Sequence, residues 1–471
     1  MSTPDIEALI LRPATEIARL IQAQQVSPVE VTQAYIERAE RLARLNAYIS
    51  LEAEQALAAA HEAEAAIASG RSLSPLHGLP IAIKDQMDVA GMRTTLGGNI
   101  VDYVAQTDAT VVARLRAAGA VILGKLNLSE YALGGNITHT YGVPHNPWDE
   151  TRQAGQSSSG SGVAVAASLA AATLGGDTAG SIRGPAAWCG IVGLRPTWGR
   201  VSRAGAFPMA WFMDTIGPMT KTVADTALIF EAIAGPDPAD PYTAKVPVTP
   251  FAQRPSLNGL RVGLVRESID DGMASPDIAA NTHAALKVLA EAGAEVGDAH
   301  LPLFASGGLI ANTLADVEAA VVHRRWLRER PADYDFATRR RLLASSLVSG
   351  ELYVKLNRFR TLVRRQVMDE LARFDVLVTP AQADPAPPIA TGTGFTSKEA
   401  VIKQFFGLRA HRSSFNLAGV PAMSVPTGFT AGGLPTSLQV VGRPFEEHVV
   451  MGLGHAYQQR TDWHEARPRL D

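Results

Sequence analysis

The segment that decides the fold runs from Gly155 to Arg183 and reads GQSSSGSGVAVAASLAAATLGGDTAGSIR. Glycine, serine and threonine crowd both of its ends, as they do in flexible loops. Between the two polar ends lies an apolar run, Val163 to Leu174, which predicts a buried helix. Small residues let one backbone, or a ligand, come close to another backbone. This interleaving is the most unusual part of the chain.

On both sides of this segment, short β-like runs alternate with helical ones. The expected strands cover residues 79–83, 120–123, 260–265, 376–378, 422–425 and 438–441. The expected helices cover residues 15–68, 110–118, 277–292 and most of 315–373. Such alternation is typical of an α/β layer fold.

Composition excludes several classes of protein. The 471 residues are 46% hydrophobic, which is enough to bury a sizeable core, and the net charge of -3 argues against a nucleic-acid surface. A single cysteine, Cys189, excludes an internal disulfide framework and a cysteine zinc cage. Without a signal-like start or an apolar run of ~20 residues, the chain is expected to be soluble and cytoplasmic, with no membrane or nucleic-acid partner.

Familiar catalytic motifs are missing from the sequence. Gly119 to Leu126 resembles a phosphate-binding loop, but Leu126 stands where Ser or Thr is needed. The sequence contains no Gly-x-Ser-x-Gly, Ser-x-x-Lys or His-Glu-x-x-His. The histidines are scattered without metal-ligand spacing, so no metal site is predicted.

Three pieces remain that could carry chemistry: residues 78–85, 155–162 and 175–183. Lys84 ends an apolar strand in the first piece, where burial would lower the pKa of its ammonium group. Taken alone, each piece is more typical of a surface strand end or a flexible loop.

Together, in this order and at these separations, the three pieces resemble the amidase signature family. The resemblance continues through residues 141–148 (YGVPHNPW), 185–197 (PAAWCGIVGLRPT), 214–219 (DTIGPM), 375–380 (DVLVTP) and 416–421 (NLAGVP). It implies a single large α/β domain with a mixed central β-sheet surrounded by helices. Within that one structural unit, residues 1–70 would form an N-terminal helical segment packed on an amidase signature domain of residues 71–471.

The resemblance also implies a catalytic triad of Lys84, Ser157 and Ser181. Ser181 would be the nucleophile, and neutral Lys84 would draw its proton away through Ser157, with no metal or organic cofactor. Making Lys84 half neutral at pH 7 requires about 4.6 kcal/mol of bias from its surroundings. Burial shifts a lysine pKa by up to ~3 to 5 units, so water must be kept away from Lys84.

The remaining site residues are expected in the loop around the nucleophile. By the same resemblance, the oxyanion would be held by the backbone N–H groups of Thr178, Ala179, Gly180 and Ser181. Asp177 and Arg183 flank this loop and would support it through hydrogen bonds.

The sequence departs from the family pattern at three positions near these residues. Gln156, Ser159 and Ala179 stand where the family has glycine, and the family's relay serine follows a cis peptide bond. If the backbone at Ala179 needs a positive φ, alanine costs on the order of 1 kcal/mol. A divergent but active enzyme is expected, and a non-catalytic amidase-like binding protein is an alternative.

The substrate is less constrained than the reaction. A segment rich in large apolar side chains, Phe207 to Met213, together with Leu133, predicts an apolar or aryl-accepting pocket. This favours a stand-alone hydrolase of small aryl amides or carbamates, and a homodimer is left open.

The alternative is the glutaminase component of a tRNA-dependent amidotransferase. In that branch an acidic residue before Asn-Leu-Ala-Gly helps to hold the amine of glutamine. The equivalent stretch here, residues 407–412, is basic, which counts against glutamine. Arg360 could still meet a carboxylate, although a solvated helix arginine is the more ordinary interpretation.

Overall fold

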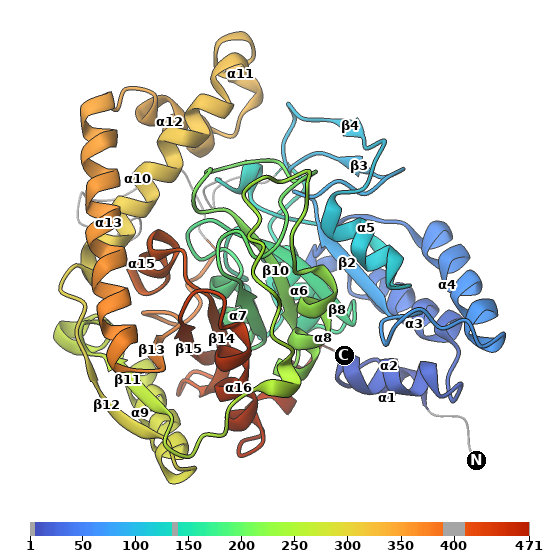
Figure 1. Ribbon diagram of the computed structural model, residues 1–471. Helices are drawn as coiled ribbons and strands as arrows, with labels where there is room; N and C mark the ends of the chain where they lie inside the picture. Colours follow the sequence, from blue (N-terminus) through green and yellow to red (C-terminus); the bar gives the residue numbers. More distant parts are fainter. Residues whose placement is uncertain (1–4, 134–139, 390–409, 471) are drawn as a thin grey trace.

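The computed structural model describes residues 5–133, 140–389 and 410–470 and is organised around one large sheet (Figure 1). Across the described residues this sheet has eleven strands. Their order is β1 (Tyr48–Leu51), β5 (Val121–Leu126), β2 (Pro80–Lys84), β8 (Ala172–Asp177), β10 (Thr215–Thr220), β9 (Val192–Arg195), β14 (Ala422–Phe429), β15 (Pro435–Gly442), β13 (Val376–Pro380), β11 (Arg261–Val265) and β12 (Glu295–Ala299). Parallel and antiparallel pairs both occur. The expected α/β fold with a mixed central sheet is confirmed.

Helices surround this sheet (Figure 1). They are α1 (Ile6–Leu9), α2 (Ala14–Gln22), α3 (Pro28–Arg41), α4 (Ala53–Ala68), α5 (Thr110–Ala117), α6 (Ser159–Ala166), α7 (Arg183–Cys189), α8 (Val223–Ile233), α9 (Pro276–Glu291), α10 (Phe304–Val322), α11 (Arg324–Glu329), α12 (Phe336–Ser345), α13 (Gly350–Arg373), α15 (Ala410–Ala418) and α16 (Glu447–Gln458). Ser27 caps the start of α3, directly before Pro28. Within the described ranges, no helix combines the length and the apolar character needed to cross a membrane.

Two of the expected helices need correction. Within the expected helix 15–68, residues 48–51 form the strand β1, which pairs with β5. The expected buried helix 163–174 is also wrong, because this run divides into the end of α6 and the start of β8. Ser168 adopts a left-handed backbone conformation (φ 56°), and the N–H of Leu169 donates to the carbonyl of Ala164, which closes the helix. Residues 172–177 then pair with β2 on one side and β10 on the other. Apolar periodicity does not separate a buried helix from a buried strand in so short a run.

The N-terminal residues pack against this sheet. β1 pairs with β5, and Ile17 and Tyr35 are fully buried in the apolar cluster that reaches α16. The ammonium group of Lys221 donates to the carbonyls of Ile10 and Arg12, at 2.8 and 3.2 Å.

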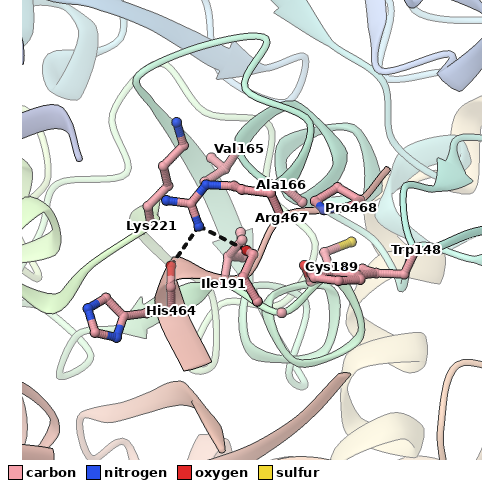
Figure 2. Close-up of a pocket in the computed structure, with 11 residues that line it drawn as sticks. Trp148, Val165, Ala166, Cys189, Ile191, Lys221, His464, Arg467 and Pro468 are labelled. Carbon is pink, nitrogen blue, oxygen red and sulfur yellow. Dashed lines mark hydrogen bonds between the residues drawn. The ribbon is translucent and has the colours of Figure 1, made fainter. Parts of the chain in front are cut away.

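Residues near the C-terminus pack close to Lys221. Arg467 donates to the carbonyls of His464 and Ala466 beside a small pocket that Lys221 also lines (Figure 2). The pocket measures about 10 Å³, which leaves room for no more than one water molecule. Distant parts of the chain are therefore tightly packed at this place.

The sheet also positions the polar loops. β2 and β8 are parallel neighbours, so their carboxyl ends lie at the same edge. Lys84 is the last residue of β2 and Asp177 is the last residue of β8. Two of the three pieces that could carry chemistry, residues 78–85 and 175–183, thereby meet at one place.

Candidate active site

A buried lysine and a buried serine form the first contact of the site. Nζ of Lys84 donates to Oγ of Ser157 at 2.8 Å, and both side chains are almost inaccessible to water. Burial lowers the pKa of Lys84 to about 7, although the negative charges of Asp177 and Asp214 act in the opposite direction. A substantial share of Lys84 is therefore neutral near pH 7 and able to accept a proton.

The loop that carries Ser157 is fixed by its backbone. The Gln156–Ser157 peptide bond is cis, as the resemblance implies, with glutamine in place of the family's glycine. Gly155 has φ 96°, and a Cβ there would lie 2.6 Å from Cα of Pro185. The N–H of Ser158 donates to the carbonyl of Ser181 at 3.2 Å. The serine-rich loop and the Ser181 loop are thus joined directly.

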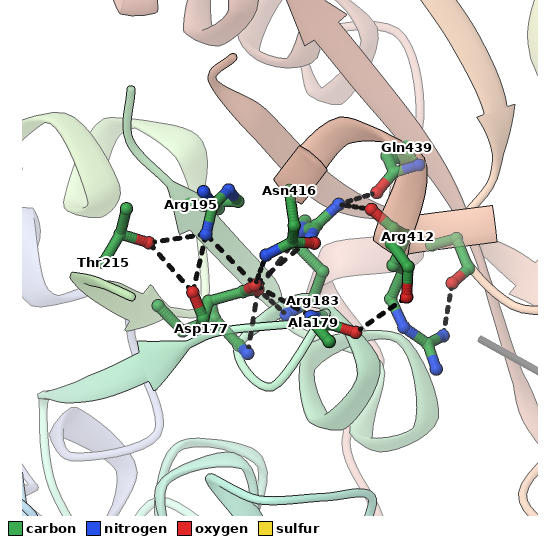
Figure 3. Close-up of polar contacts among 12 residues, drawn as sticks. Asp177, Ala179, Arg183, Arg195, Thr215, Arg412, Asn416 and Gln439 are labelled. Atoms are coloured by element: carbon green, nitrogen blue, oxygen red, sulfur yellow. Dashed lines mark hydrogen bonds and ion pairs between the residues drawn. The ribbon is translucent and has the colours of Figure 1, made fainter. Parts of the chain in front are cut away.

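The loop before Ser181 wraps around the carboxylate of Asp177 (Figure 3). This carboxylate accepts from the N–H groups of Gly180 at 2.8 Å and Ile182 at 3.1 Å. Gly180 takes the left-handed conformation (φ 108°), whereas Ala179 does not have a positive φ. The backbone cost considered for alanine at position 179 therefore does not arise.

The expected role of Gly180 in holding an oxyanion needs correction. Its N–H points at Asp177 and is occupied there. The loop's candidates for that role are therefore the N–H groups of Thr178, Ala179 and Ser181. Oγ1 of Thr178 donates to the carboxylate of Asp214 at 2.6 Å, which anchors the start of the loop.

Two buried arginines balance Asp177. Its carboxylate lies 3.1 Å from Nε of Arg183 and 3.5 Å from Nη1 of Arg195, and all three side chains are fully buried. Burial alone would raise the pKa of Asp177, but the attraction of Arg183 and Arg195 outweighs it and holds this pKa far below its usual range. Asp177 therefore remains charged and keeps the loop in place.

Sequence reasoning missed several members of this network (Figure 3). The amide of Asn416 donates to Asp177 at 2.7 Å, and Arg183 donates to Oε1 of Gln439 at 2.5 Å. Arg195 also binds the carbonyls of Asp177 and Met213. For Arg195 the sequence did offer a signal, because this charged residue ends the otherwise apolar run 191–195.

Another arginine lies against the nucleophile loop. A Cβ on Gly180 would lie 2.6 Å from Nε of Arg412, and Nη1 of Arg412 donates to the carbonyl of Ala381 at 2.6 Å. Burial lowers the pKa of Arg412 to about 10, so it remains a cation near pH 7. Residues 407–409 of the same basic stretch lie outside the described residues.

A cavity of about 210 Å³ adjoins this loop at Gly176, Asp177 and Thr178. Phe207 and Trp211 line it, as expected for the aromatic segment. Leu133, expected beside them, does not: it is buried in an apolar cluster with Met209 and Met213. Phe212 is 41% exposed and contacts Trp198 and Arg360 outside the cavity.

The described residues include no group of three or more His, Cys, Asp or Glu side chains that could hold a metal ion. A comparison with protein-family models gives a match, described as Amidase, over residues 30–451. The chain belongs to the amidase signature family. The resemblance inferred from the sequence is confirmed.

Individual proteins similar to this amidase cover almost its whole length. The A subunit of glutamyl-tRNA(Gln) amidotransferase from Moorella thermoacetica is 38% identical over 97% of this chain and 98% of its own. A solved structure described as "An unexpected vestigial protein complex reveals the evolutionary origins of an s-triazine catabolic enzyme" has a TM-score of 0.88 at 33% identity, covering 98% and 100% of the two chains. Peptide amidase from Stenotrophomonas maltophilia gives a TM-score of 0.82 at 32% identity, covering 98% of each.

These relationships establish the reaction class. The chain is an amidase, an enzyme that acts on the carbon–nitrogen bond of amides. The identity of its amide is a separate question, since one fold serves many substrates.

Proposed function

We propose that this amidase cleaves its substrate with Ser181 as nucleophile, Ser157 as proton relay and Lys84 as base. The observation that carries the proposal is the 2.8 Å contact between Nζ of Lys84 and Oγ of Ser157, both buried. A hydrogen-bonded base of depressed pKa is what a serine nucleophile requires. The direct bond between Ser158 and Ser181 supports the pairing of the two loops.

The reaction follows from this arrangement. Neutral Lys84 takes a proton from Ser157, which takes one from Ser181 as Oγ of Ser181 attacks the amide carbon. Backbone N–H groups of the loop stabilise the negative oxygen that forms. The proton then passes to the departing amine as the C–N bond breaks, and water hydrolyses the resulting acyl-enzyme.

We propose that the substrate is an aryl amide or carbamate and that the chain acts without a protein partner. The aromatic lining of the 210 Å³ cavity supports an aryl substrate. The buried cation Arg412 beside Gly180 disfavours an ammonium group at this place, and glutamine carries one.

A second candidate is the glutaminase component of an amidotransferase, which would pass ammonia to a partner. The comparisons favour this candidate over the first, because curated relatives at 37–38% identity carry that component's name over nearly their full length. One structural neighbour, whose description names a protein complex, also supports a partner.

A panel of amides separates the two candidates. The purified chain is incubated with 4-nitroanilides, simple aryl and aliphatic amides, aryl carbamates and glutamine, with Ser181→Ala as the control. Release of aryl amine by the wild type and not by Ser181→Ala is the expected result. Turnover confined to glutamine would overturn the first candidate in favour of the second.

A further inference from the structure

Gly176, Asp177 and Thr178, at the start of the nucleophile loop, line part of the cavity of about 210 Å³. Gln86, two residues after Lys84, forms part of its wall with Gly176. A Cβ on Gly176 would lie 2.5 Å from Oε1 of Gln86 and 3.6 Å from Nζ of Lys84. Gly176, which lines the cavity, therefore also lies close to the proposed base.

Part of the cavity wall is aromatic. The rings of Trp211 and Tyr242 meet edge to face, with centroids 5.2 Å apart. The guanidinium carbon of Arg203 lies 5.5 Å from the centroid of Trp211 and 5.8 Å from that of Tyr242. Cation–π contact of this kind holds the rings in place, and both rings line the cavity.

The polar groups around the cavity already have partners in the protein. Arg203 pairs with Asp240 at 3.1 Å. Asp214 accepts from Thr178 and from the N–H groups of Met209 and Ala210. Nε2 of Gln86 donates to the carbonyl of Phe207 at 2.9 Å. Arg203 is therefore paired with Asp240, and Asp214 and Gln86 already have hydrogen-bond partners, so none of these groups needs a partner from a ligand and a neutral aromatic group suits the cavity.

The size of the cavity fits one substituted ring. An engineered apolar cavity of about 150 Å³ binds benzene, so 210 Å³ leaves space for a ring with a small substituent.

We propose that this cavity is the leaving-group subsite and that it selects aryl amines, so that the substrates are anilides or N-aryl carbamates. The proposal rests on the proposed roles of Lys84, Ser157 and Ser181. The proton that the departing nitrogen takes up returns from Lys84 through Ser157, so the amine leaves on the lysine side. The C–N bond breaks, the acyl group stays on Ser181 and the neutral arylamine occupies the cavity.

Two substrates with the same acyl group test the subsite. Acetamide and 4-nitroacetanilide share the acetyl group and differ in the leaving group. Trp211→Ala removes a lining ring, and Phe212→Ala removes the next ring along the chain, which is similarly exposed and lies outside the cavity. Trp211→Ala is expected to lower kcat/KM for the anilide about tenfold, the effect of one aromatic contact, and to leave acetamide hydrolysis unchanged. Phe212→Ala is expected to leave both unchanged.

Two results with these variants would overturn the proposed subsite. Equal losses on both substrates, or a loss that follows the acyl group when 4-nitropropionanilide is compared with 4-nitroacetanilide, would show that the cavity does not hold the leaving group. If Trp211→Ala does not fold, Ala239→Phe, at the exposed rim of the cavity, replaces it with the same expected loss.

A binding measurement separates this subsite from the proposed chemistry. Calorimetry records the binding of 4-nitroaniline to Ser181→Ala, with and without Trp211→Ala. Binding that Trp211→Ala weakens supports the subsite even if no amide is turned over, in which case the proposed function fails alone. No binding of 4-nitroaniline to Ser181→Ala overturns the subsite, whatever the activity.

Discussion

At the scale of single residues, the site depends on charges that are buried in balance. Lys84 is fully buried, and burial drives its pKa down while Asp177 and Asp214 limit the fall. Asp177 is fully buried too, yet Arg183 and Arg195 keep it ionised. Burial therefore favours the neutral form of Lys84. Asp177 stays charged in spite of its burial, because the cations Arg183 and Arg195 are in contact with it.

The pKa of Lys84 predicts how activity depends on pH. Only neutral Lys84 accepts a proton, so kcat/KM is expected to fall about tenfold per unit as pH drops below about 7 and to level off above it. Asp214→Asn removes a charge that raises this pKa and is expected to move the midpoint to lower pH. A profile that is flat from pH 5 to 9 would be incompatible with lysine as the base.

Removing the charge of Asp177 is expected to destabilise the whole protein. Asp177→Asn leaves Arg183 and Arg195 buried without their carboxylate, which costs about 3 to 5 kcal/mol. The matched control is Asp149→Asn, whose partner Arg152 is partly exposed, and which should cost less than about 1 kcal/mol. Urea unfolding measures both variants, and equal losses would contradict the distinction.

At the scale of elements, the site is made where strands end and tight loops begin. β2 and β8 deliver Lys84 and Asp177 to one edge of the sheet, and the loop before α7 folds back on Asp177. The turn in that loop depends on Gly180, because its backbone is left-handed and Arg412 fills the space where a Cβ would be. Loop shape therefore follows from one glycine and one carboxylate.

Gly180→Ala tests this dependence. The backbone conformation alone costs about 1 to 2 kcal/mol, and the contact with Arg412 adds to it. Gly70→Ala carries a similar backbone cost (φ 76°) with nothing within 4 Å, so it isolates the backbone cost. Gly180→Ala should be the less stable variant and should also lose activity. Equal stability of the two variants would show that Arg412 simply moves aside.

Sequence patterns predicted some elements and not others, for physical reasons. Strands such as 376–378 are bounded by polar or proline residues, and β13 covers them. The run 163–174 was misread because a turn at Ser168 is not visible in apolar periodicity. The positions of Lys84, Ser157 and Ser181 came from the family resemblance. The partners Asn416 and Gln439 come from distant strands and helices, and only the folded chain brings them to Arg183.

At the scale of the whole molecule, one sheet and one apolar cluster join the two ends of the chain. β1 extends the sheet at one edge, and Ile17 and Tyr35 share a cluster with residues of α16. Lys221 lies in the core and Arg467 in the C-terminal tail, and both donate to carbonyls of N-terminal residues. Residues 1–70 are therefore expected to fold with the rest and not as a separate unit.

Deleting residues 1–70 tests that expectation. The shortened chain would expose the edge of β5 and the apolar surface that α2 and α3 cover, so it should lose cooperative unfolding. Circular dichroism and tryptophan fluorescence during urea unfolding measure this, with the full chain as the control. A cooperative transition of undiminished stability in the shortened chain would mean that residues 71–471 fold alone.

The most direct test of the proposed chemistry is to locate the nucleophile. A fluorophosphonate is reacted with the wild type and with Ser181→Ala, followed by digestion with trypsin. Ser157 and Ser181 fall in one tryptic peptide, residues 153–183, so fragmentation of that peptide must assign the adduct. An adduct on Ser181 in the wild type, absent from Ser181→Ala, is the predicted result. An adduct on Ser157, or no adduct on this peptide, would contradict the account.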